Sequence, residues 1–232
     1  MITKIAKKLE TGLYRSDITE RLINRMGLKD EDVNIFLKNN PSLFSHLTEN
    51  MAIPRSVGKD EAALKDHEHV FSKYPEIRDS LSSNKHSVLV TSKSTPILAH
   101  ELGHLSGEMS DDPSKMRQYL ISKNISSPAS AFGAIASQIS ADKSGSTRLG
   151  KILSLASLGL AYPVLKEEFG ATKRGLKAIK DEQGTAEAIK AGIKLAPAQL
   201  TYLAAPALPL IGASAGKFTN RALPHSLRNI KR

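Results

Sequence analysis

Two histidines and a glutamate stand within five residues of one another, in the sequence His-Glu-Leu-Gly-His at positions 100–104. In a helix, side chains four residues apart lie on one face, so the imidazoles of His100 and His104 can reach a single metal ion. Glu101 stands between them and can take a proton from a water molecule in the same cleft. This pattern is typical of zinc-dependent peptidases. The competing interpretation is a helix with two incidental histidines.

The composition narrows the choice of metal ligands. The chain of 232 residues contains no cysteine, which excludes disulfide scaffolds, cysteine-type zinc ribbons, iron–sulfur clusters and thiol nucleophiles. Any zinc must therefore be held by histidine and carboxylate, a ligand set that suits catalysis better than structure. An apolar fraction of 40% with 24% charged residues is typical of a globular protein.

A catalytic zinc site normally has three protein ligands and one open position. The extended pattern HExxHxxGxxH provides a third histidine, and Gly107 falls on its glycine position. The last position of the pattern is Ser110, however, and Asp111 comes one residue late. This pattern therefore lacks its third ligand in this chain.

A glutamate from a later helix is the other source of a third ligand. Pro163 suits the first turn of a helix, in which Phe169 and Thr172 share an apolar face with Glu168 beside it. The small side chains of Ala171 and Thr172 would let this helix approach the HELGH helix closely. Spacing alone leaves a second interpretation open, in which Glu168 is an ordinary solvated acid.

Two later segments resemble a known family. Residues 168–176, Glu-Phe-Gly-Ala-Thr-Lys-Arg-Gly-Leu, resemble the E-F-x-A-S-x-R-A-L segment of bacterial membrane-associated neutral zinc metallopeptidases, the YugP-like family. Residues 191–205 are similar to that family's A-A-x-L-T-Y-x-A-A segment. Together with HELGH, three segments stand in the family's order, and the resemblance covers residues 86–216.

The resemblance implies a zincin-like fold with a gluzincin-type site. Its zinc ligands would be His100, His104 and Glu168, and Glu101 would be the general base for hydrolysis of a polypeptide substrate. It also implies membrane helices between and after these segments. The chain departs from the family after the second histidine and at its N-terminus, where a polar region replaces a membrane helix. Side chains of the types that stabilise an oxyanion are available, and nothing in the sequence selects among them: Tyr162, Arg174, Tyr202 and His225.

The predicted fold is mainly α, in the α+β class, with the HELGH helix beside a short β element and further apolar helices. The β-branched residues 87–91 predict a strand, and a helix follows from Thr95 to Gly107 or Ser110. Residues 1–85 are expected to form a polar helical region. Its helices are expected over residues 18–26, from near Asp30 to before Pro41, and over residues 60–72 and 75–82.

Residues 86–216, the predicted metallopeptidase core, contain three uncharged stretches: residues 125–141, 152–165 and 195–216. Only the third reaches the length of about 20 residues that a membrane-spanning helix needs, and it contains three prolines. The stretches are either buried helices of a soluble core or helices seated in a membrane, with basic flanks on phosphate head groups. The resemblance favours the second interpretation.

The formal net charge of +10 is concentrated in residues 101–232, which carry +8 of it, and residues 217–232 form a basic tail without acids. Positive charge attracts phosphate, on an anionic membrane surface or on nucleic acid. Aromatic residues make up only 5% of the chain and offer little base stacking, so the membrane surface is the favoured partner and nucleic acid is not.

The first residues lack the apolar segment of a secretory signal, so the expected location is membrane-associated or cytoplasmic. The main expectation is a zinc-dependent metalloendopeptidase. An alternative function is a structural or membrane-interacting component of a larger assembly, such as a virus particle, that retains a zincin-like domain.

Overall fold

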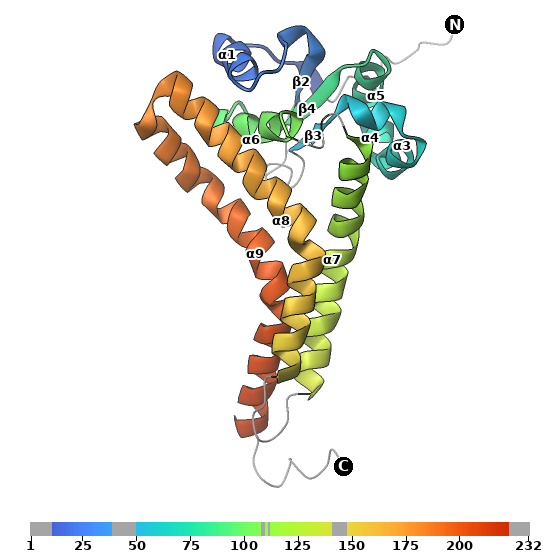
Figure 1. Cartoon of the computed structure of the whole chain (residues 1–232), viewed down its shortest axis with the longest axis vertical. Coiled ribbons are helices and arrows are strands. Elements are labelled where there is room, and N and C mark those ends of the chain that lie inside the picture. The colour runs from blue at the N-terminus through green and yellow to red at the C-terminus, as the bar shows by residue number, and fades with distance from the viewer. Residues whose placement is uncertain (1–10, 39–49, 108–109, 111, 141–147, 223–232) are drawn as a thin grey trace, which may run out of the picture. The chain divides into compact units, whose positions relative to one another are not determined.

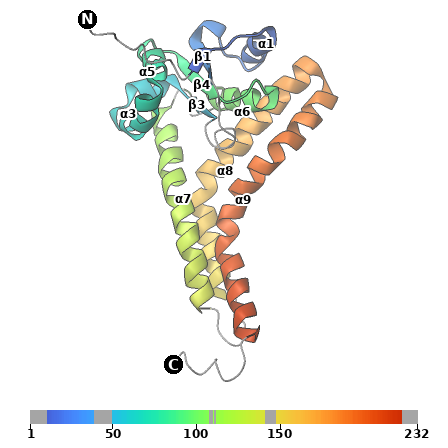
Figure 2. The same cartoon turned by 180° about the vertical axis from the view of Figure 1, so that it is seen from behind.

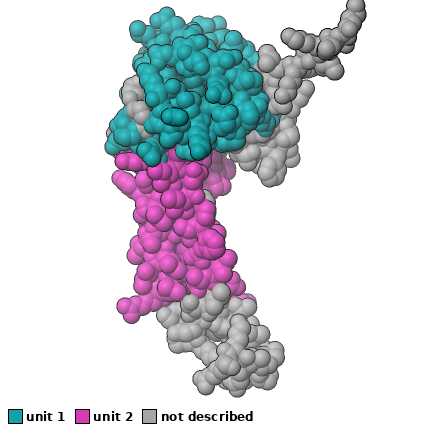
Figure 3. Space-filling view, turned by 90° about the vertical axis from the view of Figure 1, so that its right-hand side faces the viewer, with its two compact units in different colours: residues 1–117, 167–196 teal, residues 118–166, 197–232 magenta. Residues whose placement is uncertain are grey.

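The computed structural model describes residues 11–38, 50–107, 110, 112–140 and 148–222 (Figures 1 and 2). These residues are mainly helical with one small mixed sheet, as the sequence predicts. The chain divides into two compact units, which Figure 3 colours separately. Unit 1 consists of residues 1–117 and 167–196, and unit 2 consists of residues 118–166 and 197–232.

The sheet of unit 1 has four strands in the order β1-β2-β4-β3. Strand β4 (His86–Val90) pairs in parallel with β2 (Val33–Lys38) and antiparallel with β3 (Met51–Ile53), while β1 (Thr11–Leu13) pairs antiparallel with β2. All residues of β4 are buried, which suits an apolar, β-branched strand at the centre of a sheet. The strand predicted before the HELGH helix is thus confirmed, one residue earlier than expected.

The helix expected from Asp30 toward Pro41 is wrong. Residues Asp30–Asp32 form only a short 3-10 helix, η1, and Val33–Lys38 is strand β2. Ile35 of this strand is fully buried and lies opposite Val88 of β4. Strand formation depends mainly on neighbouring strands and burial, so pairing with β4 outweighs the local helix signal of the acids. The polar region of residues 1–85 therefore also supplies three of the four strands.

The other helices expected in residues 1–85 are present with small differences. The helix expected over residues 60–72 is divided at His67, which ends one helix and begins the next. A second 3-10 helix, η2, precedes them. The bounds are α1 (Asp17–Arg25), η2 (Arg55–Lys59), α3 (Glu61–Asp66), α4 (Glu68–Lys73) and α5 (Pro75–Ser82).

Helix α6 (Thr95–Leu105) follows β4 and carries the HELGH sequence. Pro96 stands in its first turn, as expected, but the helix ends at Leu105, before Gly107 and Ser110. Leu98 and Leu102 of α6 are buried in the core of unit 1. The same core contains residues from α1, β2, β4 and the parts of two long helices that belong to this unit.

Three long helices complete the described chain: α7 (Pro113–Ser140), α8 (Arg148–Gln183) and α9 (Thr185–Ala222). The three uncharged stretches lie largely within them. Only Gly184 separates α8 from α9, and its φ of +92° is in the left-handed region that favours glycine. Most of the basic tail expected at residues 217–232 lies outside the described residues.

The helix start expected at Pro163 is wrong, because this proline lies inside α8. Its missing N–H removes one helical hydrogen bond, which a proline in the first turn would not. Ala161 and Val164 beside it are buried, so packing continues across the proline. The helix is therefore longer at its N-terminal end than local sequence rules suggest.

Candidate metal centre

Helices α6 and α8 approach each other closely in unit 1, at two glycines. A Cβ atom added to Gly103 of α6 would collide with the backbone carbonyl of Ala171 in α8. Reciprocally, a Cβ atom added to Gly175 of α8 would lie 2.6 Å from the carbonyl oxygen of Ala99 in α6. The expectation that small residues let the two helices approach is therefore confirmed.

The side of α8 that meets the core is largely the predicted one, and it also includes Glu168. Glu168 is only 2% exposed and Ala171 is fully buried, whereas Phe169 is 40% exposed. Thr172 of the predicted face is 9% exposed, as expected, whereas Phe169 departs from it. Close backbone packing brings Ala171 and Glu168 inward beside Thr172. The interpretation of Glu168 as an ordinary solvated acid is wrong for the same reason.

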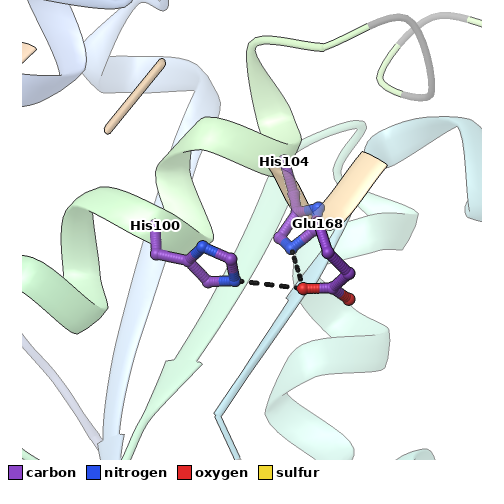
Figure 4. Close-up of side chains that lie close together, drawn as sticks. All are labelled: His100, His104 and Glu168. Atoms are coloured by element: carbon purple, nitrogen blue, oxygen red, sulfur yellow. Dashed lines mark ion pairs between the residues drawn. The ribbon is translucent and has the colours of Figure 1, made fainter. Parts of the chain in front are cut away.

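Three potential ligand atoms converge between the two helices (Figure 4). The Nε2 atom of His100 lies 3.3 Å from Oε2 of Glu168, and the Nε2 atom of His104 lies 3.6 Å from the same oxygen. One ligand atom from each residue fits within 4.8 Å of the others. This group is almost wholly buried and could hold a metal ion.

Each histidine uses its second ring nitrogen to contact another residue of α8. The Nδ1 atom of His100 lies 3.0 Å from the hydroxyl of Thr172, and the Nδ1 atom of His104 lies 3.2 Å from Oε1 of Glu167. Such contacts orient metal-ligating imidazoles and fix which nitrogen faces the metal. Both Nε2 atoms are thereby directed toward Glu168.

The carboxylates make His104 strongly basic when no metal is bound. Burial opposes its charged form, but hydrogen bonds to Glu167 and Glu168 and the charges of Glu168 and Glu101 outweigh burial. Together they raise the pKa of His104 from its usual 6.5 to about 10. The imidazole therefore carries a proton at neutral pH, which a metal ion must displace on binding.

Glu101 is a buried acid of α6 whose charge acts on His104. It is 6% exposed, and its charge contributes to the raised pKa of His104. A buried carboxylate close to a metal-ligating imidazole can serve as a proton acceptor for a molecule held in the site. All four residues singled out from the sequence thus lie together in unit 1.

Among the described residues, Ser110 and the two tyrosines considered from the sequence are not members of the ligand group, whereas Arg174 binds Glu167 beside His104. Ser110 is buried outside the ligand group, and Asp111 and His225 lie outside the described residues. Tyr162 is 63% exposed, and both Tyr162 and Tyr202 belong to unit 2.

Sequence reasoning missed Glu167 and Thr172 as partners of the histidines. Two features could have pointed to them: the pair of adjacent glutamates, and a hydroxyl residue one helical turn after Glu168. Adjacent residues on a helix point in different directions, so only the structure separates the role of Glu167 from that of Glu168. No known protein family, curated protein or solved structure matches the chain.

Proposed function

We propose that the protein is a zinc-dependent metallopeptidase. The observation that carries this proposal is the buried convergence of two imidazoles from α6 and a carboxylate from α8, with Glu101 beside them. Two histidine nitrogens and one carboxylate oxygen are a typical catalytic ligand set for zinc, which keeps its fourth position open. The resemblance to neutral zinc metallopeptidases points to the same ligands.

The protein's own groups would divide the work of hydrolysis. His100, His104 and Glu168 would hold the zinc, which would supply Lewis-acid chemistry for activating water near neutral pH and polarising a carbonyl group. Glu101 would accept the proton of the attacking water and return it to the leaving amine nitrogen. Thr172 and Glu167 would keep the two imidazoles in place during both transfers.

Zinc content and peptide cleavage test this proposal together. The purified protein should contain one zinc ion and hydrolyse casein, and Glu101→Gln should retain the zinc and lose cleavage. A matched control is Glu187→Gln, since Glu187 is an exposed acid of unit 1 paired with Lys190 and is expected to leave cleavage unchanged. Bound zinc without cleavage that depends on Glu101 would refute the peptidase and leave only a metal site.

A second candidate function, as a membrane-interacting component, is favoured by unit 2. Two helices, Arg148–Gln183 and Thr185–Ala215, are long and apolar enough to cross a membrane by length and composition. Taken alone, this is weak evidence, because core helices of soluble proteins pass the same test. The burial pattern of unit 2 adds an independent argument.

Unit 2 buries many small and polar residues and exposes many large apolar ones, whereas a soluble helical bundle does the reverse. Its buried positions on α7 include Ser122, Ser126, Ser130 and Ser137. Its helices approach each other at small residues, as where a Cβ atom on Gly212 of α9 would collide with the carbonyl of Ala134 in α7. Small and hydroxyl-bearing contacts of this kind are typical of helices that associate in lipid, where apolar burial gives no driving force.

Large apolar side chains instead point outward from each of the three helices. Examples are Phe132 on α7, Leu155 on α8 and Leu200 on α9, which are 73%, 69% and 63% exposed. Because every helix contributes, a partner on one side would cover only part of this surface, whereas lipid would cover all of it. We therefore propose lipid acyl chains as the occupant of the outward faces.

The lengths and charges of the unit 2 helices agree with lipid acyl chains as the occupant of their outward faces. The parts of α7, α8 and α9 in unit 2, residues 118–140, 148–166 and 197–222, are about 34, 28 and 39 Å long at 1.5 Å per residue. The hydrocarbon core of a bilayer is about 30 Å thick. These segments contain no acid, and their basic residues stand near segment ends, where anionic head groups would meet them.

The absence of tryptophan allows a direct test of lipid contact. Phe132→Trp in unit 2 and Leu13→Trp in unit 1 introduce single fluorophores at sites that are 73% and 71% exposed. In vesicles of phosphatidylcholine and phosphatidylglycerol with brominated acyl chains, fluorescence at position 132 should be quenched and that at position 13 should not. Equal quenching at the two sites, or protein that stays free of the vesicles, would refute the lipid contact.

A further inference from the structure

We infer that Glu167, held by Arg174, is a positioning residue that fixes the ring of His104 for metal binding. The inference rests on the proposed zinc site and extends it to a residue that is not itself a ligand. It is carried by a four-part arrangement in unit 1: the His104 imidazole, the Glu167 carboxylate, the Arg174 guanidinium and the backbone of α6.

The contacts of Glu167 connect the ligand helix to its neighbour. Its Oε1 atom lies 3.2 Å from Nδ1 of His104 and accepts a hydrogen bond of 2.6 Å from Nη2 of Arg174. The side chains of Glu167 and His104 are 12% and 8% exposed, so water screens their interaction little. A carboxylate on the far nitrogen of a metal-ligating histidine sets the ring orientation and raises its basicity as a ligand.

Arg174 keeps the carboxylate in this position. Its Nε atom donates a 2.7 Å hydrogen bond to the carbonyl oxygen of Gly103, within the HELGH turn, while Nη2 binds Glu167. The guanidinium therefore joins α8 to the backbone of α6 next to His104. This bonding assigns Arg174, a candidate for oxyanion stabilisation from its residue type, to support of the histidine instead.

The end of α6 leaves room for this pair. A Cβ atom added to Gly107 would lie 2.9 Å from Cζ of Arg174 and 3.0 Å from Oε1 of Glu167. These separations are shorter than nearly all real Cβ contacts, so a side chain at this position would displace the pair. Gly107, which falls on the glycine of the HExxHxxG pattern, thus serves in this chain to admit the Arg174 and Glu167 side chains.

Glu182 provides a matched control for Glu167. It stands on the same helix, its side chain is 13% exposed against 12% for Glu167, and it is also bound by arginine, through Arg21 and Arg25. Both of these arginines belong to α1, whereas Glu167 contacts a histidine as well as an arginine. Replacing either glutamate removes an ion pair of α8, and only the loss of Glu167 should affect His104.

The test compares Glu167→Ala, Glu167→Gln and Glu182→Ala in the full chain. Zinc affinity is measured by chelator competition, the cobalt(II) absorption spectrum reports ligand geometry, and the His104 Nδ1–H signal is followed by NMR in the zinc-loaded protein. Glu167→Ala should weaken zinc binding by about 10- to 100-fold and shift both spectra. Glu167→Gln keeps an oxygen acceptor, so its zinc affinity should lie between that of Glu167→Ala and that of the unsubstituted protein. Glu182→Ala should bind zinc normally.

Three results would overturn the inference, and they differ in what else they refute. If the unsubstituted protein binds one zinc ion and Glu167→Ala binds it equally tightly with unchanged spectra, the positioning role fails and the metal site stands. If the unsubstituted protein binds no zinc, the proposed metal site fails as well. A loss of zinc affinity that is equal in Glu167→Ala and Glu182→Ala would assign the effect to stability of α8 and would also overturn the inference.

Discussion

Replacing Gly175 with alanine is expected to loosen the metal centre without changing any of its ligand atoms. The new Cβ atom would stand 2.6 Å from the carbonyl oxygen of Ala99 and 3.1 Å from the backbone nitrogen of His100. Real Cβ atoms essentially never come closer than 3.0 Å to another atom, so α6 and α8 must separate locally by at least 0.4 Å, the difference between 3.0 and 2.6 Å. Neither contact is the end of a flexible side chain, so the backbone itself has to move.

That displacement is comparable with the tolerance of a metal site, which is about 0.5 Å. We expect zinc affinity to fall by about 10-fold or more, as for lesser disturbances around metal ligands. Overpacking costs about 1–3 kcal/mol of the free energy of unfolding. The higher helix propensity of alanine offsets about 1 kcal/mol of this, so the net loss of stability should be about 0–2 kcal/mol. A 10-fold loss of zinc affinity is about 1.4 kcal/mol, so the two effects are measured separately.

The assay is chelator competition for zinc together with urea unfolding of the metal-free protein. Gly192→Ala is the control, because its Cβ atom would lie 3.7 Å from the nearest atom of Leu176, an ordinary contact. It should gain up to about 1 kcal/mol from helix propensity and bind zinc normally. If Gly175→Ala binds zinc as tightly as Gly192→Ala, close helix packing does not set the geometry of the site.

We expect three further effects, on the ligand Glu168, on the proton of His104 and on the helix packing of unit 2. Glu168→Gln should lower zinc affinity by more than the about 10- to 100-fold typical of contacts that support the ligands, because an amide replaces a ligand carboxylate; chelator competition measures this. With EDTA present, the free energy of unfolding should fall between neutral pH and pH 10, and less so in His104→Asn. The raised pKa of His104 sets the direction of this change. The stabilisation that its proton contributes is complete below pH 6.5, its usual pKa, and is lost as the pH rises toward 10. In unit 2, Ser130→Leu should lower the melting temperature in lipid or detergent, because Ser130 is fully buried, whereas Ala131→Leu on the exposed side should not.

More of the metal centre than of the sheet could be predicted from the sequence. His100, Glu101 and His104 are close in sequence, so helical geometry alone brings them together. Glu168 required a motif resemblance, because residue spacing places it only beside the apolar face of α8 and leaves open whether it is buried. Its inward direction depends on the contacts of Gly103 and Gly175 across two helices, and pairwise packing of this kind is invisible to residue periodicity.

Strand β2 could not be found from its own residues. The acids at Asp30–Asp32 favour a helix start, and Val33 and Ile35 become strand residues only because β4 offers them a partner. The small and polar interior of unit 2 was hidden for a related reason. A serine such as Ser130 lowers the hydropathy of a stretch, yet in helix contacts within lipid the same residue favours close packing.

A crystal structure of the zinc-loaded protein, with anomalous scattering at the zinc edge, tests the central claim most directly. We expect one ion bound to Nε2 of His100, Nε2 of His104 and the carboxylate of Glu168, at about 2.0–2.2 Å from each ligand atom. An ion held by other residues, or a zinc-saturated crystal in which these three side chains bind none, would contradict it.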